Sequence, residues 1–140
     1  MPSRHLVDCD VRLAESWRDL LLACERDYPG RAYLVTCTYR SPAEQFELYK
    51  VGRRLRDDGS WVEDDDATTK VVTGFDGTRR TSKHNVRPSR ALDFAVLIGG
   101  KVTWQWAEYH AVGRMATSRG LVWGGDWPRL KDGPHLELPD

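Results

Sequence analysis

The run Ala91–Ile98 constrains the fold more than any other stretch, because it is almost wholly apolar and yet contains a carboxylate. Leu92, Phe94 and Val96 alternate with residues that are themselves mostly apolar, which is the pattern of a largely buried β-strand. Asp93 interrupts this pattern. A carboxylate in such a strand is costly unless it is ion-paired, hydrogen-bonded or bound to a metal. The sequence therefore predicts a partner for Asp93.

Two histidines could share a metal ion with Asp93. His84 lies in a loop before the strand, and His135 follows Asp132 near the other end of the chain. Two imidazoles and one carboxylate suit zinc and leave one of its coordination positions open, although other divalent ions such as cobalt accept the same ligands. Hydrolysis of an amide also needs a group that takes up and returns a proton. Asp132 could do this beside His135, so these residues indicate a metal-assisted amide hydrolase.

These motifs resemble those of the M15 zinc peptidases, a family of D-Ala-D-Ala carboxypeptidases and dipeptidases and of the L-alanyl-D-glutamate endopeptidases used as phage endolysins. The resemblance extends from about Tyr39 to His135 and rests on Ser-x-His, a later Ala-x-Asp and a terminal Asp-x-x-His. It implies that His84, Asp93 and His135 bind Zn²⁺ and that Asp132 is the catalytic base. It also implies a hedgehog/DD-peptidase-like fold and peptidoglycan as the substrate.

Further motifs of the resemblance imply the residues that meet the substrate. A Tyr-Arg-Ser start places Arg40 where it would stabilise the reacting carbonyl or hold the substrate, with Gln45 close by. Trp127 ends a Trp-Gly-Gly-Asp-Trp sequence that lines the active-site region in the endolysin branch. Gln45, Ser82 and Trp127 are the candidate substrate-binding residues. We expect Ser82 to orient the histidine loop by hydrogen bonds rather than to act as a nucleophile.

Two departures from the commonest family pattern lie between His84 and Asp93. Ser89 occupies the position of a glycine, and the interval contains the additional pair Arg87-Pro88. Proline fixes φ and disfavours helix at the residue before it. We therefore expect a rigid turn that brings His84 back toward Asp93.

The length and charge of the chain favour one soluble domain. Its 140 residues are most simply a single zinc peptidase domain, residues 1–140. The 21 basic and 21 acidic residues balance, so no electrostatic footprint for nucleic acid is present. Three scattered cysteines, Cys9, Cys24 and Cys37, do not make a disulfide framework, and we expect them to be reduced.

The same sequence bears on where the protein acts. The first residues contain no apolar core of the kind a signal peptide needs, and no apolar run is long enough to cross a membrane. We therefore expect a monomer that is made in the host cytoplasm without a membrane anchor and reaches the cell wall only after release.

Periodicity and turn signals predict an α+β fold, with about three helices around a small, largely antiparallel sheet and the metal at one sheet edge. The predicted helices cover residues 11–27, 41–55 and 104–119, and the predicted strands cover residues 32–39, 71–73, 91–98, 101–103, 121–123 and 135–138. Residues 56–70 form an acidic segment that we expect to be an exposed loop rather than a calcium site, since it lacks EF-hand spacing.

Five basic residues surround His84 in the sequence: Arg79, Arg80, Lys83, Arg87 and Arg90. They could form a solvated loop, or a positive rim that attracts the carboxylates of peptidoglycan stem peptides. Both interpretations stay open at this point.

We expect a phage-type endolysin, a zinc-dependent hydrolase of the L-alanyl-D-glutamate bond in the peptidoglycan of the bacterial cell wall. The substrate comes from the resemblance, because the residues alone argue only for metal-assisted amide hydrolysis. Two alternatives remain. One is a D-Ala-D-Ala carboxypeptidase or dipeptidase, and the other is a non-catalytic, zinc-stabilised wall-binding module.

Overall fold

The structure is a computed structural model that describes residues 1–140. It contains three α-helices, seven strands and three short 3-10 helices. The α-helices are α1 (Val11–Asp27), α2 (Pro42–Lys50) and α3 (Trp106–Thr117). The strands are β1 (Arg31–Cys37), β2 (Arg53–Leu55), β3 (Trp61–Glu63), β4 (Ala91–Ile98), β5 (Lys101–Thr103), β6 (Val122–Trp123) and β7 (His135–Glu137). The 3-10 helices are η1 (Leu6–Asp8), η2 (Lys83–Asn85) and η3 (Gly124–Asp126).

The main sheet has five strands that pair antiparallel around β4. Its order is β1-β4-β7-β6, and β5 folds back onto the end of β4 through the Gly99-Gly100 turn. β4 is therefore the central strand, with β1 on one side and β7 on the other. This position explains why β4 is almost continuously apolar, as the sequence predicts.

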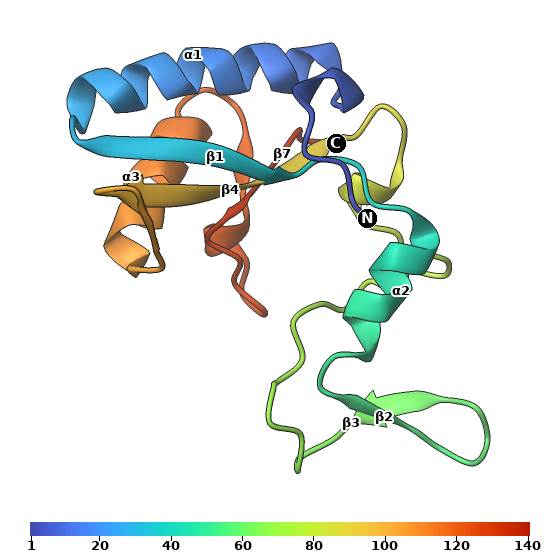
Figure 1. Cartoon of the computed structure of the whole chain (residues 1–140). Helices are drawn as coiled ribbons and strands as arrows, with labels where there is room; N and C mark the ends of the chain where they lie inside the picture. Colours follow the sequence, from blue (N-terminus) through green and yellow to red (C-terminus); the bar gives the residue numbers. More distant parts are fainter.

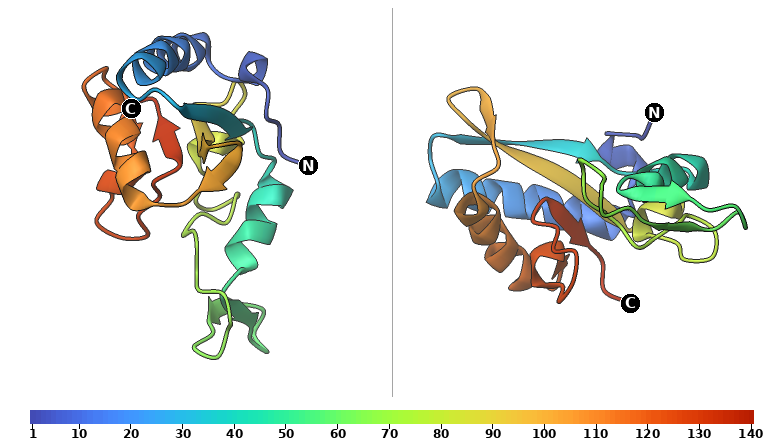
Figure 2. Two further views of the ribbon diagram at one scale, coloured as in Figure 1. Left: turned by 60° about the vertical axis from the view of Figure 1, so that its left-hand side comes forward. Right: turned by 90° about the horizontal axis from the view of Figure 1, so that it is seen from below.

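The core lies between this sheet and two of the helices. Figure 2 shows α1 and α3 on the same side of the sheet, where the apolar face of each helix meets β4. Trp17 of α1 and Tyr109 of α3 pack on Phe94, with ring centroids 5.6 and 5.4 Å away. Successive strand residues point to opposite faces, so Asp93 points away from this core.

The third helix forms part of an arm. Figure 1 shows α2 and the β2–β3 hairpin extending away from the sheet, beyond the end of β1. Ser41 and Glu44 form the predicted capping box at the start of α2. The arm thus begins immediately after Arg40, at the end of the sheet to which Asp93 belongs.

The sequence prediction was wrong about where helix α2 ends and about the elements that follow it. Helix α2 ends at Lys50 rather than near Leu55, because Gly52 adopts a φ of +79° and a Cβ there would lie 2.3 Å from the backbone nitrogen of Val71. The chain then turns into β2. The predicted loop of residues 56–70 contains β3, and residues 71–73, predicted as a strand, are irregular.

Most other elements agree with the sequence. Helix α1 and strand β4 have the predicted bounds, and Asp10 caps α1 by accepting a hydrogen bond from the backbone nitrogen of Arg12. The α+β class and the count of three helices are confirmed. None of the helices combines the length and apolar character needed to span a bilayer.

Candidate active site

The pairing register of the main sheet places three chemically active side chains in one row. Asp93 of β4 lies directly opposite Cys37 of β1 and directly opposite His135 of β7. A bulge between Val35 and Cys37 sets this register on β1. Residues opposite one another share a face of the sheet. The row therefore lies on the face away from α1 and α3, and the expectation of a site at a sheet edge was wrong.

A short, tightly hydrogen-bonded loop delivers His84 to this row. The hydroxyl of Ser82 accepts a hydrogen bond from the backbone nitrogen of His84 at 3.2 Å, and Asn85 accepts one from the backbone nitrogen of Ser82 at 2.8 Å. The Nδ1 atom of His84 lies 2.6 Å from the carbonyl oxygen of Thr38, which can only accept, so Nδ1 carries the proton. The other ring nitrogen, Nε2, is then directed to Asp93, 3.2 Å from Oδ1.

His135 approaches the same carboxylate oxygen from β7. Its Nδ1 atom lies 3.2 Å from Oδ1 of Asp93, and its Nε2 atom lies 2.8 Å from Oε1 of Glu137. Zinc ligands at bond lengths of about 2.0 Å in a tetrahedron are about 3.3 Å apart. The two nitrogen–oxygen separations match that edge length, and the donor types are those of a catalytic zinc site. The residues present therefore fit the metal that the sequence implies.

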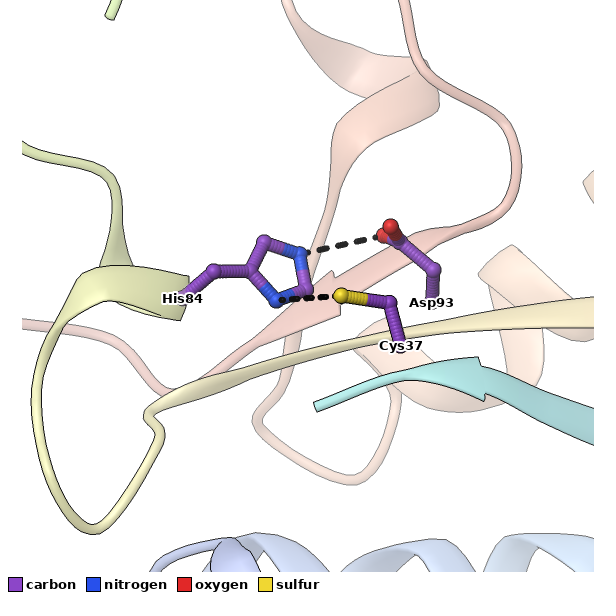
Figure 3. Close-up of side chains that lie close together, drawn as sticks. All are labelled: Cys37, His84 and Asp93. Atoms are coloured by element: carbon purple, nitrogen blue, oxygen red, sulfur yellow. Dashed lines mark hydrogen bonds and ion pairs between the residues drawn. The ribbon is translucent and has the colours of Figure 1, made fainter. Parts of the chain in front are cut away.

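Two groups of side chains could each hold a metal ion, and Asp93 belongs to both. One contains Asp93, Asp132 and His135, and the other contains Cys37, His84 and Asp93, each within 4.8 Å. Figure 3 shows that Cys37 and Asp93 lie against different nitrogens of the His84 ring. Because Nδ1 already donates to Thr38, an ion at Nε2 would not meet Cys37 through this ring. The geometry therefore does not favour Cys37 as a ligand beside His84, and His84, Asp93 and His135 stay the predicted ligand set.

Opposite charges attract these side chains to one another. Burial alone would lower the pKa of His84, but the charge of Asp93 and hydrogen bonds to Asp93 and Cys37 outweigh burial and raise the pKa to about 10. Burial alone would raise the pKa of Asp93, but the charge of His84 and hydrogen bonds from both histidines lower it. Asp93 is thus held as an ionised carboxylate that faces both histidines.

Asp132 stands beside this group and is open to solvent. Its Oδ2 atom lies 4.0 Å from Nδ1 of His135, and its side chain is 42% exposed. Partial burial and the negative charge of Asp93 raise the pKa of Asp132. A carboxylate with a raised pKa and access to water is suited to accept a proton and to return it.

The Trp-Gly-Gly motif explains how the Asp132 segment is held. The carbonyl oxygen of Gly124 accepts a hydrogen bond from the backbone nitrogen of Asp132 at 3.0 Å, and the Trp123 indole donates one to the carbonyl oxygen of Gly133 at 2.8 Å. A Cβ at Gly124 would lie 2.4 Å from the carbonyl oxygen of Asp132. Only glycine permits this close approach, which explains one of the two glycines of the motif.

Arg40 completes the group from the start of the arm. Its Nη2 atom lies 3.4 Å from Oδ2 of Asp93, and its Nη1 atom donates to Oε1 of Gln45 at 2.8 Å. Gln45 is only 1% exposed and donates to the carbonyl oxygen of Phe75 at 3.0 Å. The structure therefore places Gln45 behind Arg40, where it orients the guanidinium, rather than on a surface that a substrate could reach.

The other two substrate-binding candidates differ in position. Ser82 is buried and used by the His84 loop, so it orients the loop as expected but does not face a substrate. Trp127 is partly exposed and packs on His135, with ring centroids 4.8 Å apart. Trp127 can therefore form a wall beside the ligands.

Four of the five basic residues near His84 make specific contacts within the protein. Lys83 pairs with Glu137, and Arg90 donates to the carbonyl oxygen of Pro139. Arg80 lies over the ring of Phe75, and Arg87 lies over the ring of Tyr39. Four of the five basic residues therefore have specific partners, and the positive rim stays a prediction.

Sequence reasoning missed two residues of this site. Glu137 contacts His135. The sequence could have predicted this contact, because Glu137 lies two residues after His135 on the short final strand and residues two apart on a strand share a face. Cys37 gave no signal, because only the pairing of β1 with β4 brings its sulfur 3.7 Å from His84.

The chain is similar in sequence to known peptidases. Residues 76–138 match the M15 peptidase family model described as D-alanyl-D-alanine carboxypeptidase. The peptidoglycan L-alanyl-D-glutamate endopeptidase CwlK of Bacillus subtilis (strain 168) is 33% identical over 119 residues, which cover 78% of this chain and 62% of CwlK. The chain thus spans less than two thirds of that curated relative.

Two solved structures share the fold. The L-Ala D-Glu endopeptidase ChiX of Serratia marcescens has a TM-score of 0.65 and 24% identity, over 99% of this chain and 89% of ChiX. A variant of the vancomycin resistance D,D-pentapeptidase VanY, in complex with Zn(II), has a TM-score of 0.58 and 18% identity, over 93% of this chain and 72% of VanY. These likenesses confirm the predicted hedgehog/DD-peptidase-like architecture.

Proposed function

We propose that the chain is a metallopeptidase of the M15 family and, more specifically, a zinc-dependent peptidoglycan endopeptidase that cleaves the L-alanyl-D-glutamate bond of the stem peptide. The observation that carries the proposal is the convergence of His84 and His135 on one oxygen of Asp93, both at 3.2 Å, with Asp132 beside them. The similarity to CwlK supports the choice of bond.

In this proposal each residue has a defined task. His84, Asp93 and His135 hold the ion, which when bound supplies a Lewis acid for the attacking water and for the amide carbonyl. Asp132 takes a proton from the water as it attacks the amide carbon, and returns a proton to the leaving amine nitrogen. Arg40 is near enough to Asp93 to offer its guanidinium to the developing oxyanion.

The surroundings of the ligands support this division of tasks. Thr38 and Glu137 occupy the ring nitrogens of His84 and His135 that face away from Asp93, which leaves one nitrogen of each imidazole for the ion. Trp127 covers His135 on one side. Asp132 is the group of this cluster with the most access to solvent, as the entry of water requires.

Mass spectrometry of digested peptidoglycan tests the proposal. Purified sacculi are incubated with the zinc-loaded protein and, in parallel, with the protein after chelation. New amino-terminal D-glutamate and free L-alanine carboxyl ends, absent from the chelated sample, are the expected result. Cleavage at another bond, or equal cleavage with the metal removed, would contradict it.

The carboxypeptidase alternative rests on the description of the matching family model. Such an enzyme would release terminal D-alanine from short D-Ala-D-Ala peptides and would leave internal bonds intact. The two activities are separated by comparing D-alanine release from these peptides with amine release from intact sacculi. The non-catalytic alternative predicts wall binding and stoichiometric zinc with no released amines in either assay.

We further propose that the protein acts as a phage-type endolysin during host cell lysis. It would act as a monomer and reach the wall only after release from the host cytoplasm. Expression inside a bacterium with and without a membrane-permeabilising partner tests this. Lysis only when the membrane is opened is the expected result, and lysis by the protein alone would count against the need for release.

A further inference from the structure

Glu137 and Lys83 form a charged pair directly behind the candidate metal ligands. One carboxylate oxygen of Glu137 accepts from Nε2 of His135 at 2.8 Å, and the other lies 2.8 Å from the ammonium of Lys83. The Glu137 side chain is 14% exposed and that of Lys83 is 21% exposed. The pair is therefore largely shielded from water, unlike a surface ion pair of small energetic value.

The pair connects the two segments that carry the histidines. Lys83 immediately precedes His84 in η2, whereas Glu137 follows His135 on β7. The Lys83 ammonium also donates to the carbonyl oxygen of Leu138 and lies 3.0 Å from Oδ1 of Asp140. The pair thus fixes the position of the His84 loop relative to the final strand.

The contact between Glu137 and His135 determines which nitrogen faces the ion. An ionised carboxylate only accepts hydrogen bonds, so Nε2 of His135 must carry the proton and Nδ1 is left to coordinate. A carboxylate behind a metal-bound imidazole fixes the ring orientation and increases its basicity.

We propose that Glu137 is the positioning residue of His135, and that Lys83 acts through Glu137 to hold both histidines in the geometry that binds zinc. This inference rests on the proposed zinc site and assigns two residues that the catalytic steps do not use. Loss of an outer partner of this kind typically weakens metal binding about 10- to 100-fold.

Zinc affinity and cobalt spectra test the inference independently of activity. Dissociation constants are measured by competition with a chromophoric chelator, and the visible spectrum of the cobalt-substituted protein reports ligand geometry. We expect Glu137→Ala to bind zinc about 10- to 100-fold more weakly with an altered cobalt spectrum. Glu137→Gln should lose less, because its amide oxygen can still accept from His135.

A double-mutant cycle separates positioning from general stabilisation. If Lys83 acts through Glu137, then Lys83→Ala weakens zinc binding in the wild-type background but has no further effect on Glu137→Ala. The matched control is the ion pair of the exposed Glu47 with the partly buried Lys50 on α2, also 2.8 Å apart, where Glu47→Gln should leave zinc affinity unchanged. The Lys83→Ala and Glu137→Gln variants keep the test decisive if Glu137→Ala does not fold.

Three results would count against the proposal. A zinc affinity of Glu137→Ala and Lys83→Ala within about twofold of wild type, with an unchanged cobalt spectrum, would remove the positioning role. A wild-type protein that binds no zinc would instead remove the proposed function on which the inference rests. Lower thermal stability of the variants with unchanged zinc affinity would show a structural role only and would also overturn the inference.

Discussion

The position of Asp93 in the candidate site is fixed by the packing of its neighbours in the core. Its neighbours Leu92 and Phe94 are fully buried beneath α1 and α3, so the strand cannot shift without exposing apolar surface. The carboxylate itself meets two imidazoles and a guanidinium on the other face. Packing on one side of β4 thus positions the candidate ligand on the other side.

Replacement of the candidate base should separate catalysis from metal binding. We expect Asp132→Ala to retain zinc but to lose activity by about 10²- to 10⁴-fold, since the general base is removed and the ligands remain. His84→Ala should lose both zinc and activity. Zinc content and amine release from sacculi are measured together, with Asp66→Ala in the exposed acidic loop as the control. Full turnover of Asp132→Ala would remove the proposed role.

The pairing of His84 with Asp93 should make the stability of the metal-free protein depend on pH. Folding raises the pKa of His84 from 6.5 to about 10, so the stability from its protonation is complete below pH 6.5 and is lost as pH rises toward 10. We expect the difference in free energy of unfolding between wild type and His84→Gln to shrink between pH 7 and pH 10. Urea denaturation of both proteins after chelation measures it, and a constant difference would contradict it.

At the scale of elements, glycines permit the close packing that holds the Asp132 segment. Gly113 of α3 lies against the ring of Trp123, and a Cβ there would lie 2.2 Å from a ring atom. Trp123 in turn donates to the carbonyl oxygen of Gly133, next to Asp132. Helix α3 and strand β6 thus support the candidate base from the core side.

We therefore expect Gly113→Ala to destabilise the protein, although alanine normally favours a helix over glycine by about 1 kcal/mol. The added methyl group must displace the Trp123 ring, and overpacking of this kind costs about 1–3 kcal/mol. The free energy of unfolding of the zinc-loaded protein in urea is the measurement. An increase in stability would mean that the ring moves freely and does not support the segment.

At the scale of the whole molecule, the candidate ion joins segments that are far apart in the chain. His84 comes from η2, Asp93 from the central strand, and His135 from the last strand, while Arg40 comes from the start of the arm. An ion that binds the folded state and not the unfolded chain stabilises all of these together.

Removal of the ion should therefore lower the melting temperature as well as abolish activity. At a free zinc concentration 100 times the dissociation constant, the expected stabilisation is about 2.7 kcal/mol. Thermal unfolding is compared before chelation, after chelation and after restoration of zinc, with magnesium as the control ion. A melting temperature independent of zinc would show that these residues do not bind it in the folded state.

Much of this protein could be predicted from local signals in the sequence. The bounds of α1 and β4 and the capping box of α2 follow from periodicity and capping chemistry, which depend on neighbours in the chain, whereas the roles of the motif residues are implied by the family resemblance. The end of α2 was predicted wrongly, because the close approach of Gly52 to Val71 is not a local feature.

Only the tertiary structure decided which side chains meet around Asp93. The strand register places Cys37 and His135 on either side of it, and the fold of the arm buries Gln45 behind Arg40. Glu137 and Lys83 form an ion pair that connects the segments carrying His135 and His84. Local sequence determines the period of a strand and the start of a helix. Pairing between distant strands depends on the packing of the whole core, so spacing alone could not reveal these contacts.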